Sequence, residues 1–306
     1  MMSPDSAASS PPADRRFLIV DGHAYAYRAF YAIRQLTSPA GAPTNAIYGF
    51  IRMLVQMRAA LQPAFVAVIW DGGLAAERLQ ALPEYKAQRP EMPADLGRQL
   101  DEIVSYLEAA QVASFIQDGI EADDQIATLT RHAVAAGMEV VIASSDKDFM
   151  QLVSPRVGLL WPNDKSATIR GDADVRAKTG VGPEQIVDWL SLMGDSVDNI
   201  PGVPGVGPRT ATELLQRFGS VKALYGRLEE VKSDKLRASL ERSGDAVRRN
   251  LQLVRLKDDL PCEFSPATFA SRPGAAERLR ELFARWGFRG MLAELEKARM
   301  SQAELL

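Results

Sequence analysis

Three short apolar segments, each followed closely by acidic residues, constrain the fold of this chain more than any other feature. They are rich in β-branched and aromatic residues and alternate with longer helix-like stretches, a pattern typical of a parallel sheet flanked by helices. The segments are residues 17–20 (FLIV), 65–70 (FVAVIW) and 139–143 (EVVIA). The sequence therefore predicts an α/β fold.

The stretches around these segments predict how the rest of the chain is organised. Helical periodicity occurs at residues 46–61, 95–110 and 122–136, whereas residues 72–94 hold prolines, glycines and charges and predict a long connection or lid. Beyond about residue 175, strand signals stop and short helices alternate with Gly/Pro turns. These helices are expected at 183–193, 208–218, 220–229, 233–241 and 244–256. We expect a disordered tail over 1–16, a sheet domain over 17–175, a helical subdomain over 176–262, and a C-terminal helical segment over 263–306 that packs on the body.

Composition excludes several classes of protein. No apolar run approaches the roughly 18 residues that span a bilayer, and the polar start has no apolar core like that of a signal peptide. The single cysteine, Cys262, cannot form an internal disulfide, which favours a cytoplasmic protein. With only two histidines, His23 and His132, a zinc site of the His/Cys kind is disfavoured.

Acidic residues follow all three predicted strands. Asp21 and Asp71 come directly after the first two, and Asp146 and Asp148 follow the third. Function collects at the carboxyl ends of strands in open α/β sheets. A single aspartate there is more often a turn former or a helix cap. Three acid-ending strands favour one shared crevice.

Two further acidic groups fit the same crevice. Glu121, Asp123 and Asp124 open a predicted helix, and Asp195 and Asp198 lie three apart in GDSVDN. The alternative for the first group is favourable charge at a helix N-terminus. For the second group it is a turn with a cap.

Electrostatics favours a metal site over a bare acidic cluster. Two like charges about 4 Å apart repel by about 4 kcal/mol at an effective dielectric constant near 20. Converging carboxylates therefore need cations, unless several stay protonated. Oxygen ligands without histidine select Mg²⁺ or Mn²⁺ over zinc. Two such ions roughly 4 Å apart are a standard device for phosphodiester hydrolysis.

A glycine-rich segment, PGVPGVG at 201–207, provides the second signal. Pro208, Arg209 and Thr210 stand where an ATP-binding loop requires Lys-Ser/Thr, so an ATP site is disfavoured. Between two helices, the segment resembles a helix-hairpin-helix loop, whose glycines let backbone N–H groups approach a DNA phosphate. The alternative is a plain tight turn. The net charge of −3 includes the clustered acids, and basic residues gather at 72–94 and after the hairpin.

Several motifs in order resemble the 5′-nuclease (flap endonuclease) family, which includes the 5′-nuclease domain of bacterial DNA polymerase I. They are VDG with Tyr27-Arg28, Ala46-Ile47-Tyr48-Gly49-Phe50, Tyr85-Lys86-Ala87-x-Arg89, EADD, SSDKD, GDSVDN and PGVPGVG, over residues 17–290. The resemblance implies a PIN-like parallel sheet with a helical arch at 72–94, a helix-hairpin-helix type subdomain, and structure-specific 5′-3′ exonuclease or flap endonuclease activity in replication or repair.

The resemblance also implies roles for individual residues. Arg28 and Lys86 are expected to grip the scissile phosphate, and Tyr27 to stack on a terminal base. The metal ligands are expected in two groups: Asp21, Asp71, Glu121 and Asp123, with Asp124 beside them, for one Mg²⁺, and Asp146, Asp148, Asp195 and Asp198 for the other. DNA contacts are expected from Arg78, Arg89, Gly202, Gly205, Gly207, Arg209 and Thr210, with K⁺ at the hairpin.

The sequence departs from the family pattern at two points. Glu77 replaces an aromatic residue common before Arg78, and the chain stops at 306 without polymerase sequence. It is either free-standing, as a monomer that works beside a DNA polymerase, or a fragment. Two alternatives stay open, a PIN-type ribonuclease and a catalytically silent protein that binds branched DNA. The helical subdomain disfavours the first, and the retained acids disfavour the second.

Overall fold

A computed structural model describes residues 15–162 and 167–303 of the chain. Its centre is a five-stranded, wholly parallel sheet with the strand order β3-β2-β1-β4-β5. The strands are β1 (Arg16–Asp21), β2 (Phe65–Trp70), β3 (Ala113–Ile116), β4 (Glu139–Ala143) and β5 (Val157–Leu160). The three predicted strands are adjacent at its centre. The outer two, β3 and β5, are only four residues long, which is too short for a clear pattern.

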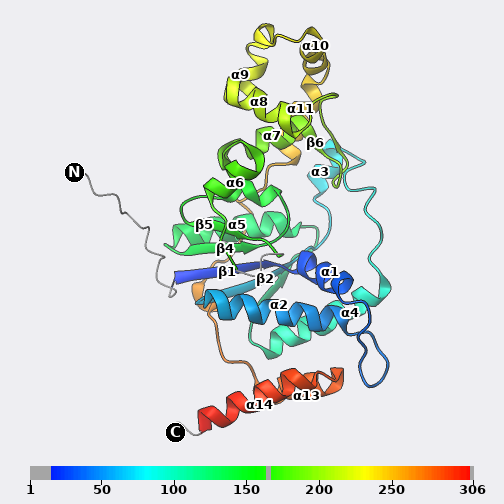
Figure 1. Cartoon of the computed structure of the whole chain (residues 1–306), viewed down its shortest axis with the longest axis vertical. Coiled ribbons are helices and arrows are strands. Elements are labelled where there is room, and N and C mark those ends of the chain that lie inside the picture. Colours follow the sequence, from blue (N-terminus) through cyan, green and yellow to red (C-terminus); the bar gives the residue numbers. More distant parts are fainter. Residues whose placement is uncertain (1–14, 163–166, 304–306) are drawn as a thin grey trace, which may run out of the picture.

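Both faces of the sheet are buried, which explains the continuous apolar runs. Phe17 and Ile19 point into the core cluster on one face, and Leu18 and Val20 into the cluster on the other. Helices therefore cover both faces (Figure 1). The helices that contribute to the second cluster are α1 (Gly22–Ala32), α2 (Asn45–Leu61), α4 (Ala94–Ala109) and α13 (Ala276–Trp286), and α5 (Ala122–Ala135) contributes to the first.

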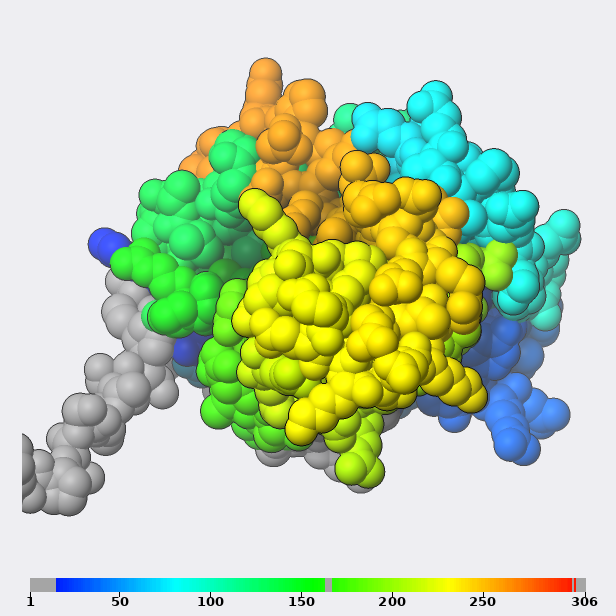
Figure 2. All heavy atoms as spheres, turned by 90° about the horizontal axis from the view of Figure 1, so that it is seen from above, coloured from blue at the N-terminus to red at the C-terminus, as the bar shows by residue number. Residues whose placement is uncertain are grey.

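The helical subdomain follows β5 and lies beyond one end of the sheet (Figure 1). Figure 2 shows that its outermost helices cover the body from above, beside the chain around residues 72–94 and 255–265. Its α-helices are α6 (Asp172–Thr179), α7 (Ile186–Met193), α8 (Pro208–Phe218), α9 (Val221–Tyr225), α10 (Asp234–Arg242) and α11 (Gly244–Leu253). A two-residue antiparallel pair, β6 (Gly194–Asp195) with β7 (Ile200–Pro201), joins α7 to the glycine hairpin. Short 3-10 turns are η2 (Asp148–Leu152), η3 (Pro183–Gln185) and η4 (Leu228–Glu230).

The predicted connection at 72–94 contains one short helix, α3 (Ala76–Ala81), followed by consecutive turns up to α4. The chain runs from α3, beside the helical subdomain, to α4 near the opposite end of the molecule (Figure 1). We refer to residues 82–93 as the strap. A long helical arch is thus replaced here by a six-residue helix and an irregular strap, in keeping with the segment's three prolines.

The C-terminal segment contains α12 (Pro266–Phe269), α13 and α14 (Arg289–Ala303). Trp286 is buried, and its indole N–H donates to a Glu102 carboxylate oxygen on α4 at 2.9 Å. This anchors α13 on the sheet domain, at the end away from the helical subdomain (Figure 1). Residues 1–14 of the predicted disordered tail (1–16) lie outside the described part, whereas Arg16 already begins β1, so the tail prediction extends too far at its end. No described helix is long and apolar enough to cross a membrane.

Candidate active site

The carboxyl ends of β1, β2 and β4 and the start of α5 line one cavity of about 400 Å³. Four of the predicted acidic ligands lie in its wall: Asp21, Asp71, Asp123 and Asp146. Asp21 ends β1 and also caps α1, because its Oδ1 accepts the Ala24 N–H at 3.0 Å. Asp21 therefore both caps α1 and lies in the wall of the cavity.

A second group of acids lies at the junction with the helical subdomain. Asp148, Asp195 and Asp198 are all buried, and one oxygen from each lies within 4.8 Å of the others. Asp148 opens η2, while Asp195 and Asp198 lie in and after β6. Within the described residues, Asp148 Oδ1 is buried without a hydrogen-bond partner. A buried acceptor without a donor, among hard oxygen ligands, fits a divalent cation.

Ser144 joins the two strand ends that carry the acids. Its hydroxyl donates to Asp21 Oδ2 at 2.8 Å and accepts the Asp146 N–H at 3.1 Å. It is buried and orients both carboxylate-bearing segments. A serine in a strand-end SSD motif commonly forms a turn, so its position in the sequence carries no specific signal for this role.

Burial and mutual repulsion raise the pKa values of the clustered acids. Burial is the largest cause for Asp21, whose pKa is raised to about 6, and the carboxylates of Asp146 and Asp71 add to it. Burial and then neighbouring carboxylates raise the pKa of Asp123 and of Asp148 well above the usual range. The repulsion expected from the sequence is therefore present in the structure.

The strap brings cations to these acids. Lys86 Nζ lies 2.5 Å from Glu121 Oε2 and 3.9 Å from Asp198, and Arg89 lies 2.8 Å from Asp198. The Tyr85 hydroxyl lies 3.0 Å from Glu121 and 3.3 Å from Asp198. Lys86 adopts a left-handed backbone (φ +56°), and its N–H donates to the Asp198 carbonyl at 3.0 Å. The strap is thus held on the second acidic group through both backbone and side chains.

Two predicted assignments are wrong in this structure. Arg78 was expected to contact DNA, but it is buried and forms two 2.8 Å hydrogen bonds to Asp124. Its Nε donates to the Leu253 carbonyl on α11 at 3.1 Å. Asp124 is therefore a partner of Arg78 and does not line the cavity. Successive helix residues point about 100° apart, so Asp123 faces the cavity and Asp124 does not.

Glu121 contacts both α3 and the strap. It is buried, lies 3.2 Å from Arg78 and accepts the Ala75 N–H at 3.2 Å, besides pairing with Lys86. Although burial raises its pKa, the two cations outweigh burial and hold the pKa below its usual range. In this structure Glu121 links α3 and the strap to α5.

The remaining DNA-facing residues fall into two groups. Tyr27 lines the cavity and stacks on Tyr31 with ring centroids 6.4 Å apart, and Arg28 lies half-buried on the same helix, α1. At the hairpin, Arg209 has a side chain that is 92% exposed, and Thr210 is half-buried. Tyr27 in the cavity wall and the exposed Arg209 can both be reached by a ligand.

The three hairpin glycines are not equivalent. A Cβ on Gly202 would lie 2.2 Å from the Met193 backbone, so packing against the end of α7 requires this glycine, and its DNA contact stays a prediction. Gly205 has a positive φ of 85°, which favours glycine, and open space lies beside it and beside Gly207. These two positions leave the backbone accessible at the start of α8.

His23 is a site residue that the sequence reasoning missed. It lines the cavity, and its Nδ1 accepts the Asp71 N–H at 3.0 Å. The sequence offered a signal, because His23 lies two residues after a strand-end aspartate. A lone histidine at a helix start is nevertheless a common structural residue.

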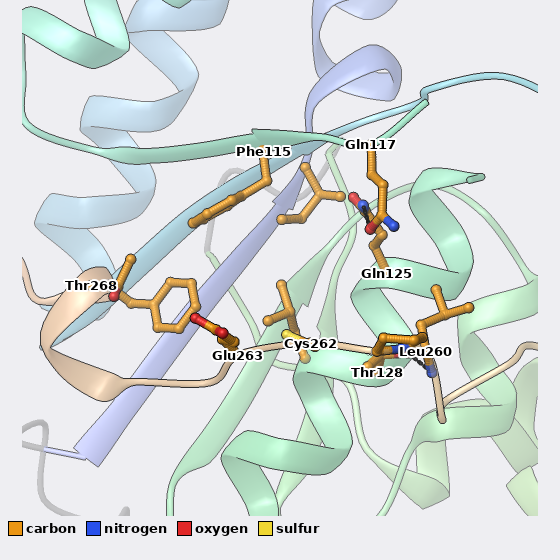
Figure 3. Close-up of a pocket in the computed structure, with 12 residues that line it drawn as sticks. Phe115, Gln117, Gln125, Thr128, Leu260, Cys262, Glu263 and Thr268 are labelled. Carbon is orange, nitrogen blue, oxygen red and sulfur yellow. Dashed lines mark hydrogen bonds between the residues drawn. The ribbon is translucent and has the colours of Figure 1, made fainter. Parts of the chain in front are cut away.

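A second cavity of about 240 Å³ lies between β3, α5 and the chain around residues 260–269 (Figure 3). Phe115, Leu260 and Phe269 give it an apolar wall, and Gln117 and Gln125 bond to each other at 3.1 Å. Of the acids named in either group above, none lines it. The chemistry therefore belongs to the first cavity.

Comparisons with known proteins agree with this geometry. Residues 16–180 match the family model of the 5′-3′ exonuclease N-terminal resolvase-like domain, and residues 181–277 match that of the 5′-3′ exonuclease C-terminal SAM fold. This chain belongs to the 5′-3′ exonuclease family. The predicted family, and the predicted parallel sheet with a helical subdomain, are confirmed.

Relatives of two lengths match the chain. A 5′-3′ exonuclease of Aquifex aeolicus is 36% identical, covering 91% of this chain and 94% of the relative. DNA polymerase I of Bacillus caldotenax is also 36% identical, covering 92% of this chain, but the match spans only about a third (32%) of that protein. As a member of this family, the chain is homologous to 5′-3′ exonucleases.

Solved structures share the fold. A bacteriophage T5 flap endonuclease in a complex with DNA and metal ions has a TM-score of 0.65 at 23% identity, covering 95% of this chain and all of that one. The catalytic core of Rad2 in complex with DNA substrate has a TM-score of 0.63 at 16% identity, covering 93% of this chain and 94% of that one. At 23% and 16% identity, these two neighbours show that the fold is shared.

Proposed function

We propose that this protein hydrolyses DNA phosphodiester bonds near free 5′ ends, at flaps and nicks, as a 5′-3′ exonuclease and flap endonuclease. The observation that carries the proposal is that the two acidic groups both lie beside Lys86 and Arg89 of the strap. One group opens into the 400 Å³ cavity and the other lies under Lys86 and Arg89.

The residues present fit two divalent cations, and Mg²⁺ suits all-oxygen ligands of this kind. Mn²⁺ is expected to substitute. Bound there, such ions polarise the phosphate and lower the pKa of water. Asp21, Asp71, Asp123 and Asp146 supply ligands around the cavity, and Asp148, Asp195 and Asp198 supply them at the junction.

The chain's own residues then position the strand. Arg28 and Lys86 supply positive charge for the phosphate, and Tyr27 offers an aromatic face on which a terminal base can stack. Ser144 keeps the strand-end carboxylates aligned through its two hydrogen bonds. Gly205, Gly207, Arg209 and Thr210 at the start of α8 contact the duplex backbone without reading sequence, and K⁺ is a candidate ion there.

The cellular setting is part of the same proposal. We propose a cytoplasmic monomer that acts in replication or repair, beside a DNA polymerase supplied by another chain or by another part of the same one. A PIN-type ribonuclease is disfavoured because the helical subdomain matches the exonuclease family model over residues 181–277.

Cleavage-site mapping tests the proposal. Labelled flap, nicked, blunt and single-stranded DNA, together with the same strands as RNA, are incubated with Mg²⁺. We expect cleavage near the 5′ end of the flap and nicked DNA, and its loss in Asp71→Asn and Asp146→Asn. Binding without cleavage by the wild-type protein would indicate a silent DNA-binding protein, and preferred cleavage of RNA would indicate a ribonuclease.

A further inference from the structure

The orientation of His23 in the cavity is fixed on two sides. The edge-to-face contact with Trp70 has a 5.4 Å centroid distance and a 90° interplanar angle. Trp70 itself packs on Gly22, where a Cβ would lie 2.5 Å from the indole ring. On the other side, Nδ1 accepts the Asp71 N–H. The imidazole is therefore held by β2 and by the backbone of a cavity acid.

This hydrogen bond determines the tautomer. A nitrogen that accepts an N–H carries no proton, so in the neutral ring the proton resides on Nε2. Across the described residues, no hydrogen bond involves Nε2, nor is it among the buried atoms that lack partners. Nε2–H is therefore a neutral donor that can serve a molecule in the cavity.

The character of the cavity indicates what this donor serves. Its cations, Lys86 and Arg89, already pair with Glu121 and Asp198. Four of its other lining residues are aspartates, which only accept hydrogen bonds when ionised. A phosphate oxygen needs hydrogen-bond donors. A neutral donor does not pair with the acidic group, so the carboxylates stay available for divalent cations.

We propose that His23 contacts the cleaved strand, with Nε2–H donating to a non-bridging oxygen of a phosphate next to the scissile bond. The proposal rests on the proposed function and adds a substrate contact that is separate from Arg28 and Lys86. The alternative is that His23 only positions Asp71 through Nδ1.

Two isosteric variants separate these roles. In His23→Gln the side-chain amide N–H reaches the position of Nε2, whereas in His23→Asn the amide oxygen takes the position of Nδ1. We expect His23→Gln to keep kcat/KM within about threefold of wild type and His23→Asn to lose roughly tenfold or more, as for a lost hydrogen bond to a charged group. The Kd for uncleaved flap DNA in chelator is expected to rise in His23→Asn only. Thermal melting checks that both variants fold.

A methylphosphonate scan identifies the contact directly. Single phosphates on either side of the scissile bond are replaced by neutral methylphosphonates, and each substrate is cleaved by wild type and by His23→Asn. We expect the penalty of the variant to disappear at one position, since the hydrogen bond is already lost there. If the rate penalties of His23→Asn and of the methylphosphonate add fully at every position, the proposal is overturned. It is also overturned if His23→Asn keeps its activity and His23→Gln loses it. If wild type cleaves no 5′-ended DNA, the proposed function fails instead.

Discussion

At the scale of single residues, the surroundings of each acid decide its role. Asp123 and Asp124 are neighbours in sequence, yet one lines the cavity and the other is neutralised by Arg78. Asp148 is buried with an acceptor atom that no described donor reaches. A carboxylate left in that state is costly unless a cation or a proton joins it.

Replacing Asp148 tests this reading. Asp148→Asn removes one negative charge from the buried group, so the metal-free protein should melt at a higher temperature than wild type. The same change should lower kcat on the order of 10³-fold, because a ligand for the divalent cation is lost. Calorimetry in chelator and single-turnover cleavage measure the two effects. A variant that is less stable in chelator and cleaves normally contradicts the assignment.

Arg78 is expected to matter for stability rather than for DNA. Arg78→Leu leaves the Asp124 carboxylate buried without its partner, and losing one member of a buried pair costs about 3–5 kcal/mol. Urea unfolding in chelator measures the loss. Arg98→Leu is the matched control, because Arg98 pairs with Asp95 on the exposed surface and should cost under about 1 kcal/mol. Equal losses for the two variants contradict the anchoring role.

At the scale of elements, the strap and the glycine hairpin offer two separate contact regions. The strap is fastened over the acids through the Lys86 N–H and through Asn199, whose side-chain amide donates to the Glu84 carbonyl at 2.8 Å. The hairpin leads into α8, whose first turn presents the exposed Arg209. We therefore propose that the strap acts on the reacting strand and the hairpin on the duplex.

A paired measurement separates the two elements. Lys86→Met should slow single-turnover cleavage of a flap far more than it weakens duplex binding. Arg209→Gln should do the opposite, and it should reduce the salt dependence of binding by about one phosphate contact. Lys235→Gln, on the exposed part of α10, is the control for a general loss of charge. If Lys86→Met and Arg209→Gln lose binding and rate in the same proportion, the division between strap and hairpin does not hold.

The sequence predicted those elements whose signals are local. The central strands and their terminal acids were readable because a doubly buried parallel strand is a continuous apolar run. β3 and β5 were too short to stand out, and the 72–94 segment was expected to form an arch. The Arg78–Asp124 pair and the contacts of Ser144 and His23 depend on which side chains meet across the fold. The spacing of residues along the sequence does not specify such long-range side-chain contacts.

At the scale of the whole molecule, the acidic groups link folding to protons and to metal. A carboxyl whose pKa is higher in the folded state than in the unfolded chain binds its proton more tightly when folded. Stability then falls as pH rises between the two pKa values. For Asp21 this window runs from 3.8 to about 6, and Asp123 and Asp148 shift in the same direction. Glu121 shifts the other way, so its contribution is lost only as pH falls below about 4.5.

Without metal, the free energy of unfolding should therefore decrease as pH rises from about 5 to about 7. Divalent cations bind the ionised carboxylates of the folded protein, so about 10 mM Mg²⁺ should raise the melting temperature more near pH 7.5 than near pH 5.5. Asp148→Asn should reduce both the pH slope and the Mg²⁺ effect, whereas Asp245→Asn, on an exposed helix start, should change neither. Melting curves in chelator and in Mg²⁺ at the two pH values provide the test. A metal-free protein that becomes more stable from pH 5 to pH 7, or one whose melting temperature ignores Mg²⁺ at both pH values, would show that the carboxylates do not form one coupled site.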